Sequence, residues 1–175
     1  MPFPSGVQKD RVLVAAARQG DRNAFGQLYQ RFAPMVHGIL LARVPRHDAE
    51  DLLQDVFVSA LRRLSTLRDD DAFGGWLAMI ARNRARDHYR RSVNQTELSE
   101  NIAAPSDPDG RALTVLGAIR RLPEAYRETL VLRLVEGMTG EEIASRTGLT
   151  HASVRVNLHR GMKRLREFLA KEGLP

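Results

Sequence analysis

A short segment near the C-terminus constrains the fold more than any other part of the sequence. Thr139 and Glu142 form a capping-box pattern, which predicts that a helix begins there. Gly148 lies where that helix must end in a left-handed residue, and Thr150 can cap a second helix that runs to about Ala170. Two helices joined by so tight a turn predict a helix-turn-helix, whose second helix enters the major groove of DNA.

The residue types in this segment agree with two closely crossing helices that present a basic face. Ala144 is small enough to let the helices cross, and the apolar contacts between them are expected from Ile143, Leu149, Val154 and Leu158. An ordinary helical hairpin with a solvated basic face is the alternative. The first turns of a recognition helix usually touch bases, and later cations touch phosphates. The residues predicted to contact base edges are Ser153, Arg155 and Asn157. Those predicted to contact phosphates are Arg160, Lys163 and Arg164. The same DNA-facing side also includes Thr150, His151 and His159.

A second cationic helix is expected between residues 73 and 91. Arg82, Arg86 and Arg90 follow one another at intervals of four residues, which predicts a ridge of cations along one helix face. Trp76 lies near this ridge. Aromatic side chains beside cations suit single-stranded DNA, where bases stack and cations hold the backbone. A tryptophan buried in the core is the alternative for Trp76.

An acidic helix precedes it in the sequence. Asp48, Asp51 and Asp55 are spaced three and four residues apart, so they stack on one exposed face. The opposite, buried face is expected to consist of Leu53, Val56, Phe57, Ala60 and Leu64. Like charges at this spacing repel one another, although the helix N-terminus offsets part of that cost. The acidic face is therefore either a solvated helix start or a docking face for a basic partner.

Helical periodicity dominates the chain and strand-like alternation is nearly absent, so the predicted fold class is all-α. We expect two small helical domains, at residues 1–91 and 111–175, joined by a flexible acidic linker at 92–110. The linker has few large apolar residues, no Lys or Arg, and the acidic residues Glu97, Glu100, Asp107 and Asp109. It is either a solvated spacer or a polyanion that lies in a nucleic-acid channel.

Composition narrows the function classes. The chain has 27 Lys and Arg against 21 Asp and Glu, a formal charge of +6, which is compatible with a nucleic-acid partner. The absence of cysteine excludes disulfides and cysteine-based zinc sites. No signal-peptide pattern and no apolar run of about 20 residues occur, so we expect a cytoplasmic protein without membrane insertion. The histidines lack metal-ligand spacing, and no nucleophile elbow or phosphate loop occurs. An enzyme, a metal site or a cofactor is therefore not expected.

Four strings, taken in order, resemble the sigma-70 superfamily, specifically its extracytoplasmic-function group. They are AFGQLY at 24–29, DAEDLLQDVF at 48–57, WLxxIAxNxxxDxxRR at 76–91, and LPExxR at 122–127 followed by the helix-turn-helix. The resemblance covers about residues 19–169. It implies that the first domain is sigma region 2, a helical bundle, and that the second is sigma region 4.

This resemblance implies a set of partners and contacts. Region 2 would dock on the clamp coiled coil of the largest subunit of core RNA polymerase through Asp48, Asp51, Leu52, Gln54 and Asp55. Region 2 would also capture an unpaired base of the minus-ten promoter element, with contacts from Arg68, Phe73, Trp76, Asn83, Arg86, Asp87, Arg90 and Arg91. Region 4 would bind the minus-thirty-five element and the flap region of the polymerase. The linker would follow the path of the template strand and the RNA exit.

The expected function is therefore that of a sigma factor, which directs promoter-specific initiation and is held in check by an anti-sigma factor. The alternative is a conventional helix-turn-helix repressor or activator, which usually dimerises and needs no docking face for polymerase. Two positions depart from the commonest family pattern: Gly74 and Gly75 precede Trp76, and His151 lies in the first turn of the recognition helix. They bear on the choice of promoter.

Overall fold

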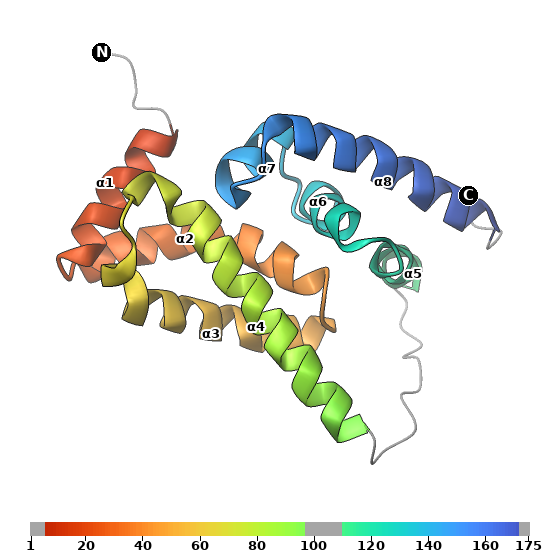
Figure 1. Cartoon of the computed structure of the whole chain (residues 1–175), viewed down its shortest axis with the longest axis horizontal. Coiled ribbons are helices and arrows are strands. Elements are labelled where there is room, and N and C mark those ends of the chain that lie inside the picture. Colours follow the sequence, from red (N-terminus) through yellow and green to blue (C-terminus); the bar gives the residue numbers. More distant parts are fainter. Residues whose placement is uncertain (1–5, 97–109, 172–175) are drawn as a thin grey trace.

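The computed structural model describes residues 6–96 and 110–171, and within these two ranges the chain is helical and forms no strand. The first range contains α1 (Gly6–Arg18), α2 (Arg22–Leu41), α3 (Arg46–Arg63), two short 3-10 turns, η1 (Leu64–Thr66) and η2 (Asp70–Ala72), and α4 (Phe73–Thr96). The second contains α5 (Gly110–Arg120), α6 (Glu124–Leu134), α7 (Gly140–Thr147) and α8 (His151–Lys171). The two sets of helices confirm the all-α fold class with two helical domains (Figure 1).

The first set is built around α2, which packs against α1, α3 and α4. Asp21 caps the start of α2, because its side chain accepts hydrogen bonds from the backbone N–H groups of Asn23 and Ala24 at 2.8 and 3.0 Å. Along α2 the side chains of Leu28 and Ile39 are fully buried. This helix therefore supplies the centre of the core on which α3 and α4 are placed.

The second set contains the predicted helix-turn-helix. Thr139 Oγ1 accepts a hydrogen bond from Glu142 N at 3.1 Å, and Glu142 Oε2 accepts one from Thr139 N at 2.8 Å, so the capping box is confirmed. Gly148 ends α7 with a φ of 75°. Thr150 Oγ1 then accepts from Ser153 N at 3.1 Å and so caps α8. All three local predictions for this segment are confirmed.

The helix α4 differs from its predicted bounds at one end. It begins at Phe73 as expected, with Gly74 and Gly75 in its first turn. It continues to Thr96, five residues beyond the predicted end of the first domain at Arg91. The acidic residues of the predicted linker lie outside the described residues, so its flexibility and the domain boundaries remain predictions.

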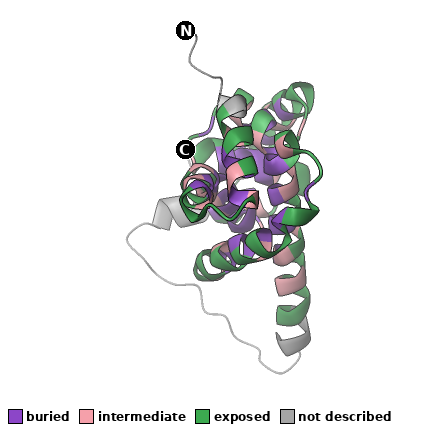
Figure 2. Ribbon diagram, turned by 90° about the vertical axis from the view of Figure 1, so that its left-hand side faces the viewer, coloured by how far each residue is buried: buried purple, intermediate pink, exposed green. Residues whose placement is uncertain are grey.

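The two sets of helices pack against each other along α2 and α4 on one side and α6 and α7 on the other (Figure 1). Figure 2 shows buried residues gathered where the helices meet. Two glycines permit close approach between the sets. A Cβ at Gly38 would lie 2.7 Å from Leu132 Cδ2, and a Cβ at Gly74 would lie 2.5 Å from the carbonyl oxygen of Arg146. Side chains at these two positions would hold the sets apart.

One ion pair between the sets is sensitive to pH. His37 Nδ1, on α2, lies 2.6 Å from Glu136 Oε1, which follows α6. The hydrogen bond and charge of Glu136 raise the pKa of His37 above its ordinary value of 6.5, against the opposing effect of burial. Glu50 also raises this pKa and Arg46 lowers it. A raised pKa in the folded state means that protonation of His37 stabilises the packed arrangement.

We therefore predict that the wild-type chain loses stability as the pH rises through the raised pKa of His37. The stabilising contribution is fully present below pH 6.5, the ordinary value, and amounts to about 1 kcal/mol or less, since the pair is partly exposed. Urea unfolding of wild type and His37→Gln, measured across this pH range, checks the prediction. The free energies of unfolding of the two proteins should differ at acidic pH and approach the same value at alkaline pH. Parallel pH profiles would contradict the assignment.

Candidate nucleic-acid and polymerase interface

The recognition helix α8 lies along the outer edge of the molecule, away from the first set of helices (Figure 1). Most of its predicted DNA-facing residues are exposed, and Asn157 is half-buried. Ser153 is exposed, but its hydroxyl accepts a hydrogen bond from Thr150 Oγ1 at 2.8 Å, so both side chains take part in the helix cap. The exposed residues are Thr150, His151, Ser153, Arg155, His159, Arg160, Lys163 and Arg164.

The helix α8 packs closely against α6. Gly161 lets α8 approach α6 closely, since a Cβ there would lie 3.1 Å from Leu130 Cδ1 and 3.2 Å from Tyr126 Cβ. Arg164 stacks over the ring of Tyr126 at 5.6 Å from its centroid. The guanidinium of Arg164 therefore both packs on α6 and remains exposed at the helix surface.

The cationic ridge predicted on α4 is only partly exposed. Arg82 donates to Glu128 Oε2 at 3.0 Å and to Glu128 Oε1 at 2.6 Å, so it pairs with α6 and does not face solvent as a free cation. The prediction of a continuous ridge from Arg82 to Arg90 is therefore wrong for this arrangement. Arg86 is exposed, and Arg90 is exposed but paired with Asp87.

Glu128 also accepts a hydrogen bond from a second arginine. Arg43, just after α2, donates from Nη2 to Glu128 Oε2 at 2.6 Å and to Glu124 Oε1 at 2.8 Å. Glu128 is only 4% exposed. Burial by itself raises the pKa of Glu128, but the hydrogen bonds and charges of Arg82 and Arg43 outweigh it, and the net pKa shift is downward. The carboxylate is therefore ionised and shared between two cations of the first set.

The aromatic residues at the start of α4 pack in the core. Phe73 is 1% exposed and meets the ring of Phe32 edge-on at 5.1 Å. Trp76 is half-buried, with its ring 5.9 Å from that of Phe73. This supports the alternative that Trp76 belongs to the core. Phe73 lies beneath the surface of α4, so its ring is not available to stack on a base. The other predicted minus-ten residues at the surface are Arg68, Asn83, Arg86, Arg90 and Arg91, with Asp87 half-buried.

The acidic face of α3 is present at the surface. Asp51, Gln54 and Asp55 are exposed. Asp48 is less accessible, because His88 Nε2 of α4 lies 3.2 Å from its carboxylate. Leu52 is 9% exposed and packs in the core, so it holds the helix in place and does not reach a partner.

A groove between α6 and α8 was not foreseen from the sequence. Its apolar floor includes Leu134, Leu158 and Met162, and its basic rim consists of Arg133, His159, Lys163 and Arg166. Leu134 is 46% exposed. Two large apolar residues that follow one another, Leu134 and Val135, were the sequence signal.

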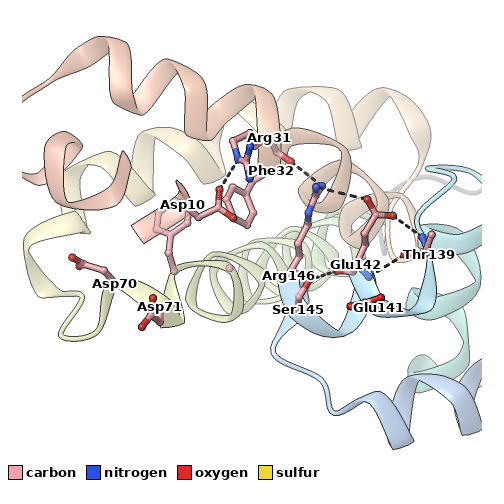
Figure 3. A pocket seen from close by; sticks show the side chains of 12 residues that line it. Asp10, Arg31, Phe32, Asp70, Asp71, Thr139, Glu141, Glu142, Ser145 and Arg146 are labelled. Atoms are coloured by element: carbon pink, nitrogen blue, oxygen red, sulfur yellow. Dashed lines mark hydrogen bonds and ion pairs between the residues drawn. The ribbon is translucent and has the colours of Figure 1, made fainter. Parts of the chain in front are cut away.

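A second depression lies between the two sets of helices and is lined by carboxylates and arginines from both (Figure 3). Arg146 of α7 donates from Nη1 to the carbonyl oxygen of Arg31 at 3.1 Å, and Arg31 in turn pairs with Asp10 at 2.5 Å. The carboxylates that line the depression are Asp10, Asp70, Asp71, Glu141 and Glu142. Within residues 6–96 and 110–171, no group of three or more potential ligands could hold a metal ion.

Comparison with known proteins gives the same picture for both sets of helices. Residues 28–94 match the family Sigma-70 region 2, and residues 112–165 match Sigma-70, region 4. The chain is 38% identical to RNA polymerase sigma factor CarQ of Myxococcus xanthus over 165 residues, which cover 88% of this chain and 94% of CarQ. It is 32% identical to the ECF RNA polymerase sigma-E factor of Escherichia coli strain K12, over 86% of this chain and 89% of that protein.

The fold agrees with a solved structure of a related protein. CnrH, known as an RNA polymerase sigma factor of Cupriavidus metallidurans, has been solved in complex with the cytosolic domain of CnrY. It superposes with a TM-score of 0.68 at 29% identity, over 93% of this chain and 98% of that one. No helix in the part of the chain that the structure describes has the length and apolar character needed to cross a membrane.

The exposed face of α8 predicts two classes of variant. Arg155→Ala should relax the preference for one or two base pairs and cost about 1–3 kcal/mol on the preferred duplex. Lys163→Ala should weaken binding to all sequences about equally and lower the salt dependence by about one counterion. Selection of a randomised duplex library with each full-length variant, together with salt titrations, checks both. Equal effects of the two variants on every sequence would contradict direct base readout by Arg155.

Proposed function

The chain belongs to the sigma-70 family of RNA polymerase sigma factors, in the extracytoplasmic-function group. From this membership we propose which surface of the chain contacts each partner during transcription initiation. Region 2 binds core polymerase and the minus-ten element, and region 4 binds the minus-thirty-five element. The observation that carries the proposal is the capped helix-turn-helix, in which the cationic side chains of α8 are exposed. Such a face has the shape and charge to enter a major groove.

The acidic face of α3 is proposed as the polymerase-docking site. Asp51, Gln54 and Asp55 project from one exposed side of a helix whose other side is buried. Carboxylates in this arrangement suit a basic partner surface, which here is the clamp coiled coil of the largest subunit. Asp48 contributes from the edge of the face, beside His88.

The surface of α4 is proposed to hold the unpaired strand of the minus-ten element. Asn83 offers hydrogen bonds to a base, and Arg86 and Arg91 are exposed for the backbone. Arg90 and Asp87 form an ion pair that can exchange for contacts with the strand.

Two protein partners are proposed for region 4. The groove between α6 and α8 has an apolar floor and a basic rim, which suits an amphipathic helix with acidic flanks such as one from the polymerase flap region. An anti-sigma factor is the second partner, supported by the complex of CnrH with the cytosolic domain of another protein. We propose that the chain acts in the cytoplasm, where polymerase and chromosomal DNA are found, and that it works by binding and not by catalysis.

Run-off transcription with purified core polymerase on genomic promoter fragments tests the function. The wild-type chain should direct initiation from discrete start sites. Asp55→Lys should weaken core binding about tenfold or more, because a like charge would face the basic partner. Glu141→Lys, which reverses an exposed acidic residue on α7, is the matched control and should keep core binding near the wild-type level. Absence of promoter-dependent transcripts with the wild-type chain would overturn the proposal.

A further inference from the structure

A small pocket between α4 and α6 is rich in positive charge. Its volume is about 290 Å³, close to the lower limit of about 300 Å³ for sites that enclose small ligands. We call it the arginine pocket, because four of its lining side chains are arginines. The polar and aromatic residues that line it are Arg43, Arg82, Arg86, Tyr89, Glu124 and Arg127.

Two of these arginines are neutralised by carboxylates of α6. Arg43 donates to Glu124 Oε1 from Nε at 3.1 Å and from Nη2 at 2.8 Å. Arg82 donates to both carboxylate oxygens of Glu128, which is 4% exposed. Each carboxylate is therefore matched by one arginine, and these two pairs together add no net charge to the arginine pocket.

The other two arginines, Arg86 and Arg127, keep their charge. Arg86 is exposed and forms no hydrogen bond or ion pair with another described residue. Arg127 is half-buried, and its Nη1 donates to the carbonyl oxygen of Arg120 at 3.3 Å. Its buried Nε has no hydrogen-bond partner within residues 6–96 and 110–171. Because an unpaired buried donor is costly, this guanidinium would gain from an added acceptor.

An aromatic ring also lines the arginine pocket. Tyr89 is 63% exposed. It follows Arg86 by three residues on α4, so the two side chains are neighbours on one helix face. Nucleobases stack on exposed aromatic rings whatever their identity, because every base has a π-face. The pocket therefore offers a stacking surface one helical turn from an unpaired cation.

We propose that the arginine pocket binds a nucleoside 5′-monophosphate, with the phosphate between Arg86 and Arg127 and the base on Tyr89. A phosphate monoester carries about 1.5 to 2 negative charges at pH 7, which matches the two unpaired arginines. Arginine also donates in parallel to two phosphate oxygens. The small volume suits one nucleotide. This site goes beyond the proposed function, because it takes a free ligand and combines side chains of α4 and α6.

Calorimetric titration of the full chain, without polymerase or promoter DNA, tests the site. Adenosine 5′-monophosphate should bind with a dissociation constant of about 1 mM or lower. Adenosine and inorganic phosphate should each bind at least about fivefold more weakly, because each lacks one of the two recognised groups. No binding of the nucleotide would overturn the proposal. Equal binding of inorganic phosphate would mean an unspecific anion site and would also overturn it.

Two arginine variants test whether binding occurs at this pocket. Arg127→Gln should weaken binding of adenosine 5′-monophosphate about tenfold, because a charged donor to the phosphate is lost. Arg62→Gln is the matched control, since Arg62 is exposed on α3 and does not line the pocket. It should keep the wild-type affinity. Equal losses in the two variants would show attraction by overall charge alone and would contradict the assignment.

A third variant tests the stacking surface and leaves the charge unchanged. Tyr89→Leu replaces an exposed side chain, so the fold should be retained, which circular dichroism checks. This variant should bind adenosine 5′-monophosphate about fivefold or more weakly, and inorganic phosphate as the wild type does. An unchanged affinity for the nucleotide would refute the role of Tyr89 and with it the proposal. None of these titrations contains polymerase, so their failure is distinguishable from a failure of run-off transcription.

Discussion

The arrangement of the two regions depends on the carboxylate of Glu128. A buried charge is tolerated only where opposite charges and hydrogen bonds replace its hydration. Here Arg43 and Arg82 supply both, one from just after α2 and the other from within α4 of region 2. The contacts of His37, Arg120 and Arg146 join the same two regions. Because two close-approach glycines flank the cluster, the fit between the regions is steric as well as electrostatic.

The two surfaces proposed to bind DNA differ in this arrangement. The face of α8 is exposed, whereas α4 has its first arginine paired and its first turn covered by region 4. The acidic face of α3 is exposed as well, apart from Asp48. The surface proposed for the unpaired strand is therefore partly covered by region 4, whereas the surfaces proposed for polymerase and duplex DNA are exposed.

The sequence predicted best what depends on neighbours in the chain. Thr139, Glu142, Gly148 and Thr150 act within a few residues of one another, so the helix-turn-helix follows from local patterns. The ridge beginning at Arg82 was wrong because its partner, Glu128, lies 46 residues away, and helix periodicity cannot reveal a distant counter-charge. Phe73 and Leu52 are buried for a similar reason, since the helix that covers each is set by tertiary packing. The contact of Gly74 with α7 likewise arises only from tertiary structure.

A distance measurement between the regions tests this account most directly. The sequence has no cysteine, so cysteines introduced at Ser65 and Ala170, both exposed, provide two unique sites for spin labels. Pulsed electron paramagnetic resonance should give one narrow distance population for the chain with Glu128 intact and a broader distribution after Glu128→Gln. A broad distribution with Glu128 intact, or a distribution that Glu128→Gln leaves unchanged, would contradict the role given to this carboxylate.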